Sequence, residues 1–171
     1  MSPLVYSDAF IRGILRRTRT IALVGASDNP SRPSWIVLKY LRAKGFTVFA
    51  VNPLLAGRTI LGEPVYASLA DIAAPIDMVE VFRNAAAAGP IVDEALALRP
   101  LPSVVWMQLS VRNDEAAARA QGAGLDVVMD RCPKIEYGRL SGEIGWTGVN
   151  SRLLSAKKPT MRDGFQKRTL A

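Results

Sequence analysis

The stretch Thr20-Ile-Ala-Leu-Val-Gly25-Ala-Ser-Asp-Asn-Pro30-Ser-Arg-Pro-Ser-Trp-Ile36 decides the fold class of this chain. It begins with an uncharged apolar run, which is typical of a strand buried on both faces. The chain then turns at Gly25, passes through small polar residues and starts a new apolar pattern after Pro33. A strand, a tight polar loop and a helix start together present free backbone N–H groups to a phosphate. We therefore predict a phosphate-binding loop in this stretch.

Apolar segments of strand length alternate with segments of helical spacing along the rest of the chain. Strands are predicted over residues 20–24, 46–51, 76–82, 102–108 and 125–129, and helices over residues 8–18, 34–44, 90–98 and 114–121. We expect Ser7, Ser34 and Asn113 to cap helices and Pro90 to lie in the first turn of its helix. The alternation predicts an α/β fold with an open, doubly wound, mostly parallel five-stranded sheet and helices on both faces.

The predicted connections and ends set the domain boundaries. Residues 52–67 form a long apolar connection, with a short extended piece near residues 60–61, and residues 68–71 form a helical turn. Residues 141–171 contain many Gly, Ser and basic residues and show little periodicity. We predict one folded domain over residues 1–140 and a basic, partly ordered tail over residues 141–171.

The composition is that of an ordinary globular protein, with 49% apolar and 22% charged residues in a chain of 171. No apolar run approaches the ~20 residues that span a bilayer. The N-terminus has no basic segment followed by an apolar one, so we expect no secretory signal. A single cysteine, Cys132, rules out an intrachain disulfide. We expect a cytoplasmic protein with no membrane partner.

The net charge of +7 is concentrated at the two ends. Residues 1–20 carry +3 and residues 150–171 carry +5, whereas the long middle carries −1. A nucleic-acid-binding surface would cluster cations on a folded face. We therefore expect solvated basic ends and regard a nucleic-acid partner as the weaker interpretation.

The sequence contains no histidine. That excludes Ser-His-Asp and Cys-His nucleophile activation as well as histidine-containing metal sites. One cysteine cannot build a thiolate zinc site, and no Asp/Glu cluster has ligand spacing. The absence of these catalytic groups favours a binding protein over an enzyme.

The loops that follow the predicted strands should meet at one edge of the sheet, where α/β proteins bind ligands. Gly25, Ala26 and Ser27 would let a diphosphate approach the backbone, the helix start at Ser34 would favour an anion, and Arg32 is a candidate cation. The alternative is a plain strand-to-helix turn capped by a serine. Arg32 and the paired prolines favour phosphate binding.

The end of the second strand separates the candidate cofactors. An NAD site would place Asp or Glu there to hold the ribose hydroxyls, and its glycine-rich loop would contain three glycines rather than one. The sequence at this point is Ala50-Val51-Asn52-Pro53, without an acid. NADP and coenzyme A both carry a phosphorylated ribose and both fit. Arg58 is either a partner for that phosphate or a solvated loop cation.

Four residues near the later strand ends have two interpretations each. A half-buried Arg83 would need an anion, and Gln108 would bind an amide such as that of a pantetheine arm or satisfy local backbone. Phe82 lines the site or belongs to the core. Arg131 could lower the pKa of Cys132, but lone cysteines are more often small buried side chains, and we favour burial.

These segments resemble a known family of small stand-alone proteins. The matching residues are Val24-Gly-Ala-Ser27 with Arg32-Pro-Ser34, Val51-Asn-Pro53 with Gly57 and Ile60-Leu-Gly62, Val81-Phe-Arg83, Val105-Trp-Met-Gln108 and Val128-Met-Asp-Arg-Cys132. The chain resembles the CoA-binding domain family, which is related to the CoA-binding domain of the succinyl-CoA synthetase alpha subunit. The resemblance spans about residues 4–159 and implies a Rossmann-like fold that binds coenzyme A, with no established reaction. The synthetase relatives use a phosphorylated histidine in a separate domain, which this chain lacks.

We predict that the protein binds coenzyme A or an acyl-CoA at the carboxyl ends of the strands without catalysis of its own. The predicted site consists of Gly25, Ala26, Ser27, Arg32 and Ser34 for the diphosphate, Val51, Asn52 and Pro53 beside the adenosine, and Phe82, Arg83 and Gln108 along the pantetheine arm. The alternative is an NADP-dependent oxidoreductase that uses Tyr66 or Tyr137 as proton donor. The sequence leaves open a homodimer and a mixed disulfide between Cys132 and the CoA thiol.

Overall fold

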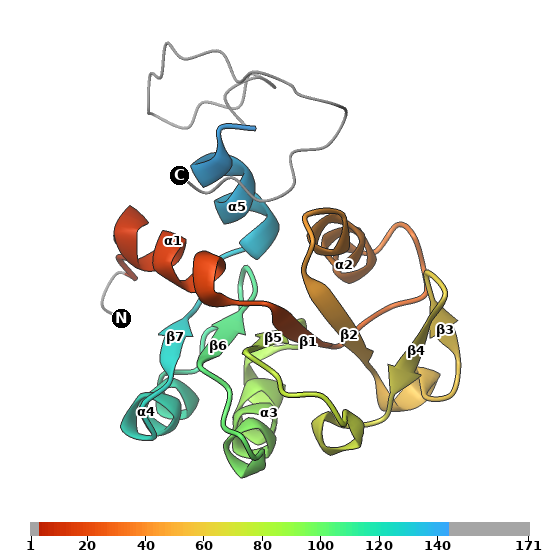
Figure 1. The fold of residues 1–171 in the computed structure, drawn as a ribbon. Coiled ribbons are helices and arrows are strands. Elements are labelled where there is room, and N and C mark those ends of the chain that lie inside the picture. The colour runs from red at the N-terminus through yellow and green to blue at the C-terminus, as the bar shows by residue number, and fades with distance from the viewer. Residues whose placement is uncertain (1–3, 144–171) are drawn as a thin grey trace.

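The computed structural model describes residues 4–143, which form a twisted sheet between two layers of helices (Figure 1). The described strands are β1 (Thr20–Val24), β2 (Thr47–Val51), β3 (Thr59–Ile60), β4 (Glu63–Tyr66), β5 (Met78–Val81), β6 (Val104–Met107) and β7 (Asp126–Val128). They lie in the order β3-β4-β2-β1-β5-β6-β7, and all neighbours pair in parallel except β3 and β4. The expected α/β, mostly parallel, Rossmann-like architecture is confirmed.

The prediction of five strands is wrong, because the described sheet has seven. The long connection after β2 forms a hairpin, in which Thr59 and Ile60 of β3 pair with Pro64 and Glu63 of β4. β4 also extends the parallel sheet through Val65 and Tyr66. Strands this short give almost no alternating pattern in a sequence, so the periodicity of the segment could not reveal them.

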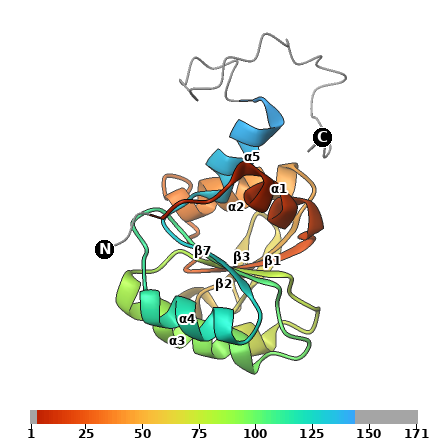
Figure 2. The ribbon, with the colours of Figure 1, turned by 90° about the vertical axis from the view of Figure 1, so that its left-hand side faces the viewer.

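Two helical layers cover the sheet, as Figure 2 shows most plainly. One layer contains α1 (Asp8–Arg17), α2 (Pro33–Ala43) and α5 (Pro133–Ser141), and the other contains α3 (Ala85–Ala97) and α4 (Asp114–Gly122). Two short 3-10 helices, η1 (Pro53–Leu55) and η2 (Leu69–Asp71), lie in the connections around the hairpin. The expected helical turn near residues 68–71 is thus present, whereas α5 was not expected.

The helix starts explain two differences from the sequence expectations. Ser7 and Asn113 accept backbone N–H groups and cap α1 and α4 as expected. α3 begins earlier than expected because Asn84 caps it through Ala87 N–H, at 2.9 Å. Pro90 therefore lies inside the helix and not in its first turn. The run of alanines before it has the highest helix propensity, which favours the earlier start.

Alternating strand residues contribute to two apolar cores on opposite faces of the sheet. Leu23 and Trp106 pack with α1, α2 and α5, whereas Ala22 and Val105 pack with α3 and α4. The indole N–H of Trp106 donates to the Arg131 carbonyl at 2.8 Å, which ties β6 to the segment before α5. Both cores consist of aliphatic and aromatic side chains, so the fully buried Glu80 of β5 is an exception.

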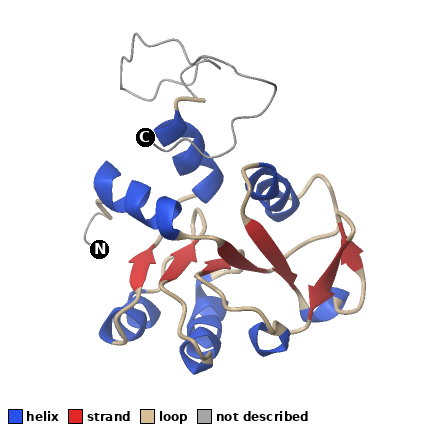
Figure 3. Ribbon diagram, in the orientation of Figure 1, coloured by secondary structure: helices blue, strands red, loops and turns tan. Residues whose placement is uncertain are grey.

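The strand order reverses between β1 and β5. From β1 the chain adds β2 and then the β3–β4 hairpin on one side, and returns to the other side of β1 for β5, β6 and β7 (Figure 3). Ligands of open α/β sheets bind beyond the carboxyl ends of the strands at such a reversal. The loops after β1 and β5 therefore define the candidate site. The predicted tail lies mostly outside the described residues, and α5 extends to Ser141.

Candidate functional site

The loops after β1 and β5 come into close contact at Gly25. This glycine has φ +95°, and a Cβ added to it would lie 2.5 Å from the Phe82 carbonyl oxygen and 3.0 Å from Cδ of Arg83. Phe82 N–H also donates to the Val24 carbonyl at 2.8 Å. Both the backbone angle and the neighbouring Phe82 carbonyl therefore exclude a residue with a Cβ at position 25. The same contact brings the exposed side chain of Arg83 over the loop after β1.

The loop after β1 is fixed to the end of β2 by hydrogen bonds. Gly25 and Ala26 donate their N–H groups to the Val51 carbonyl at 2.9 and 3.2 Å. Asn52 donates Nδ2 to the Ala26 carbonyl at 2.8 Å. These bonds engage the amides of Gly25 and Ala26, so other groups must act as open donors. Within residues 4–143, the N–H groups of Ser27, Asp28 and Ser34 have no acceptor.

The start of α2 corrects one expectation. Arg32 and not Ser34 occupies the cap position, the helix begins at Pro33, and no side chain caps it. Ser34 is buried in the first turn, and its hydroxyl makes no hydrogen bond with another described residue. An uncapped helix start with an open N–H and an open hydroxyl is a favourable place for an anion. Pro53, by contrast, is exposed at the start of η1.

Two arginines near these donors have free charges. Arg32 and Arg83 are exposed, and neither forms an ion pair in the part of the chain that the structure describes. The expectation of a half-buried Arg83 is therefore wrong, because the loop after β5 leaves it in solvent. Arg58 pairs with Asp28 at 2.9 Å, with both side chains well exposed. That pair links the loops after β1 and β2, and exposed pairs of this kind are weak.

A buried polar cluster lies beneath the same edge of the sheet. Gln108, which follows β6, donates Nε2 to Oε1 of Glu80 at 3.4 Å and accepts Leu109 N–H at 2.8 Å. Burial raises the pKa of Glu80 well above its usual value. Cys132 is also buried, at the cap position of α5. Burial raises the pKa of its thiol, and the N–H groups of Ile135 and Lys134 and the Gln108 side chain oppose that rise.

Glu80 was missed by the site prediction. The one signal in the sequence was an acid between Val79 and Val81 of a predicted strand, since an acid there is costly to bury unless it is paired or hydrogen-bonded. The disfavoured alternative, in which Arg131 lowers the pKa of Cys132, gains no support, because its guanidinium lies 5.6 Å from the Tyr6 ring and donates to the Leu4 carbonyl. The expectation of a buried Cys132 is confirmed.

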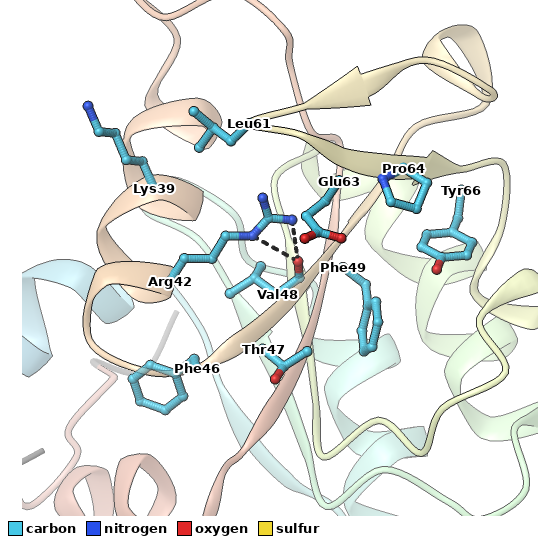
Figure 4. A pocket seen from close by; sticks show the side chains of 10 residues that line it. All are labelled: Lys39, Arg42, Phe46, Thr47, Val48, Phe49, Leu61, Glu63, Pro64 and Tyr66. Carbon is cyan, nitrogen blue, oxygen red and sulfur yellow. Dashed lines mark hydrogen bonds between the residues drawn. The ribbon is translucent and has the colours of Figure 1, made fainter. Parts of the chain in front are cut away.

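A cavity of about 450 Å³ lies elsewhere, between α2, β2 and the β3–β4 hairpin (Figure 4). Only Ala50 and Val51 of β2 pair with β4, so the first half of β2 has an open edge there. Arg42 covers that edge by donating Nε and Nη2 to the Val48 carbonyl, at 3.2 and 2.7 Å. The cavity thus results from a short neighbouring strand and lies away from the loops that form the candidate site.

Among the described residues, no group of three or more Cys, Asp or Glu side chains could hold a metal ion. The helices of this part of the chain are all too short or too polar to cross a membrane.

Residues 19–138 match the family model described as a CoA binding domain. The chain belongs to this family. It is 36% identical over 131 residues to the uncharacterised protein YneT of Bacillus subtilis strain 168, covering 77% of this chain and 94% of that protein. A solved Thermus thermophilus protein is 40% identical, with a TM-score of 0.74, over 78% of this chain and 98% of that one. A hypothetical protein from Pyrococcus horikoshii OT3 is 38% identical, with a TM-score of 0.74, over 82% and 99% of the two chains.

Proposed function

We propose that this protein binds coenzyme A or an acyl-CoA at the carboxyl ends of its parallel strands, without catalysis of its own. The observation that carries the proposal is the group of open donors between β1 and α2, within a chain that belongs to a CoA binding domain family. The N–H groups of Ser27, Asp28 and Ser34 would hold the diphosphate, with the Ser34 hydroxyl beside them. Backbone N–H groups at a helix start suit a phosphate because they are free donors at the end of the helix where the dipole favours negative charge.

Arg83 and Arg32 supply the positive charge that this diphosphate needs. Both are exposed and have no ion pair among residues 4–143. The side chain of Arg83 lies against Gly25, which favours a contact with the diphosphate more than with the pantetheine arm. Phe82, which packs against the core from the same loop, would border the start of that arm.

The end of β2 supports a phosphorylated ribose. Val51 is buried, Asn52 is tied to the loop after β1, and Pro53 is exposed beside them, so no carboxylate from β2 faces the adenosine position. Arg58 is held by Asp28 at 2.9 Å, and a ligand phosphate would have to compete with that carboxylate. Because the pair is exposed, exchanging one partner for a ligand phosphate has a small energetic cost.

The oxidoreductase alternative has little structural support. Tyr137 is buried and packs edge-on against Tyr40 and Phe46, with centroid distances of 6.2 and 5.9 Å. Tyr66 packs edge-on against Phe49 at 5.9 Å. The rings of Tyr137 and Tyr66 are therefore both engaged in aromatic packing.

Calorimetric titration of the full chain tests the proposal. CoA and acetyl-CoA should bind, dephospho-CoA should bind more weakly because it lacks the 3′-phosphate, and NADPH and NAD should give no comparable heat. Ser34→Ala should weaken CoA binding by about 1–3 kcal/mol if the hydroxyl contacts the diphosphate, whereas Ser103→Ala at the opposite edge should not. Tight NADPH binding without CoA binding would overturn the proposal.

A further inference from the structure

Glu80, Gln108 and Cys132 form a polar cluster, of which only Gln108 belongs to the site predicted from the sequence. Their exposed fractions are 0%, 7% and 6%, so all three residues are buried. Glu80 is the third residue of the four-residue strand β5, Gln108 follows β6, and Cys132 caps α5. Three separate segments therefore bring these side chains together just beneath the carboxyl edge of the sheet.

The Gln108 amide has a determined orientation. Its oxygen accepts the Leu109 N–H at 2.8 Å, and an amide NH₂ could not take that role because it has no acceptor lone pair. Its nitrogen must therefore face Glu80, to which it donates at 3.4 Å. The Gln108 side chain also approaches the Cys132 thiol. Leu109 N–H and Glu80 together thus hold the nitrogen side of this amide toward the cluster.

Glu80 is itself incompletely paired. Oε1 accepts the bond from Gln108, whereas Oε2 is buried and has no partner among the described residues. No cation pairs with this carboxyl within residues 4–143, and burial raises its pKa well above the usual value. A neutral acid with Oε1 accepting carries its proton on Oε2. Burial also raises the pKa of the Cys132 thiol, which therefore keeps its proton.

The cluster consequently has more hydrogen-bond donors than acceptors, because the oxygens Oε1 of Glu80 and Oε1 of Gln108 are already engaged. A buried polar atom without a partner in a native protein calls for an explanation, and a bound ligand is one of the few available. Gln108 lies two strands from Gly25, which is about 10 Å at the usual spacing between neighbouring strands. An arm that starts at a diphosphate on the loop after β1 would pass this point before its thiol end.

We propose that Gln108 donates to a carbonyl oxygen of the ligand's pantetheine arm, and that Glu80 is the positioning residue that orients Gln108 for this contact. The inference rests on the proposed binding of a CoA-type ligand. The acceptor is a neutral carbonyl, supplied by an arm amide or by an acyl thioester. We assign it to an arm amide, because the separation of the two loops is shorter than the whole arm. A diphosphate would not suit this place, because its charge would lie beside the buried Glu80 and Cys132, and no cation pairs with Glu80 among residues 4–143.

The test compares three ligands with four single variants and one double variant by calorimetry on the full chain. Adenosine 3′,5′-bisphosphate lacks the arm, CoA has the arm amides, and acetyl-CoA adds a thioester carbonyl. Gln108→Leu and Glu80→Leu should each weaken CoA binding about three- to tenfold while leaving the bisphosphate affinity unchanged. Glu80→Gln should keep most of the affinity, because its amide can still accept from Gln108. Gln121→Leu, at an exposed position of α4, is the matched control.

Each outcome separates the two proposals. Because the bisphosphate needs only the phosphate loops, its unchanged binding shows that a variant is folded and that the arm alone is affected. The double variant Glu80→Leu/Gln108→Leu should lose no more than Gln108→Leu does, as expected of a residue that acts through another. A larger loss with acetyl-CoA than with CoA would assign the carbonyl to the thioester. Equal CoA binding by wild type, Gln108→Leu and Glu80→Leu would overturn the inference, whereas no binding of any ligand to wild type would overturn the proposed function.

Discussion

The side chain of Asn52 donates Nδ2 to the Ala26 carbonyl at 2.8 Å and so joins the carboxyl ends of β2 and β1. Its Oδ1 accepts Leu54 N–H at 2.9 Å and starts η1. Two strand ends are therefore held at a fixed separation by one residue. The loop that bears the open N–H groups of Ser27 and Asp28 depends on this arrangement.

Asn52→Asp separates the two roles, because a carboxylate keeps the acceptor for Leu54 and loses the donor for Ala26. We expect Asn52→Ala to lower the free energy of unfolding by about 1–2 kcal/mol. Asn52→Asp should weaken CoA binding at least as much as Asn52→Ala, since its charge faces a carbonyl oxygen and a diphosphate. Urea unfolding and calorimetry measure the two effects. Wild-type affinity in Asn52→Asp would show that the tie to Ala26 does not shape the binding loop.

Gly25→Ala should destabilise the fold more than an alanine at another glycine with a similar backbone angle. A positive φ alone costs about 1–3 kcal/mol for a residue with a Cβ. At Gly25 the added Cβ also meets the Phe82 carbonyl at 2.5 Å, whereas at Gly124, with φ +89°, it meets nothing within 4 Å. The difference between the unfolding free energies of Gly25→Ala and Gly124→Ala measures that contact. Equal values would mean that the two loops are not in close contact.

Arg83→Ala should reduce CoA affinity by about 1–3 kcal/mol, the range for a charge-assisted hydrogen bond. The loss should shrink as salt is added, because an exposed cation is screened. Stability should not change, since Arg83 has no ion pair among the described residues. Arg99→Ala is the control, because it removes the same charge at the opposite edge of the sheet. Equal effects of the two variants would point to a general electrostatic attraction and not to a contact.

Glu80→Gln should stabilise the protein increasingly as the pH rises. The unfolded chain loses the Glu80 proton near its usual pKa of 4.5, whereas the folded chain keeps it to a higher pH. The folded state therefore binds more protons in this window, and its stability falls with rising pH by up to about 1.4 kcal/mol per unit. Glu80→Gln removes that dependence. Unfolding measured from pH 5 to 8 avoids ionisation of Cys132, the titratable group of α5 that faces Glu80. Parallel curves for variant and wild type would contradict a neutral Glu80.

Much of the fold was predictable because its signals are local. The run Thr20–Val24 and the caps Ser7 and Asn113 follow directly from residue type and spacing. The β3–β4 hairpin was not predictable, since its pairing depends on where β2 leaves an open edge. α5 was missed for a related reason. Its nine residues are held by tertiary contacts such as the ion pair between Arg139 and Asp8, at 2.8 Å, and not by a strong apolar stripe.

The candidate site also has a part that the sequence predicts and a part that depends on tertiary contacts. Sequence reasoning identified the loops, because the carboxyl ends of parallel strands must meet at one edge. It could not tell which amides stay open, since Gly25 and Ala26 lose theirs to Val51 through tertiary pairing. It placed Ser34 at the helix cap, whereas the observed cap residue is Arg32, two residues earlier. Glu80 is recognised as a site residue because its buried Oε2 has no hydrogen-bond partner among the described residues. Whether an atom has a partner depends on the fold and cannot be read from the sequence of one strand.

Cys132 should be a poor nucleophile in the native protein despite its place at the start of a helix. It is buried, burial raises the pKa of its thiol, and the guanidinium of Arg131 is engaged with Tyr6 and Leu4. Thiolate is the reactive form, so alkylation by iodoacetamide at pH 8 should be at least about a hundredfold slower in buffer than in denaturant. Mass spectrometry after incubation with CoA disulfide should show no adduct at Cys132 in the native chain. Rapid alkylation of the native protein, or a stoichiometric CoA adduct, would show that the thiol is both accessible and ionised. The cluster of Glu80, Gln108 and Cys132 would then be a redox site.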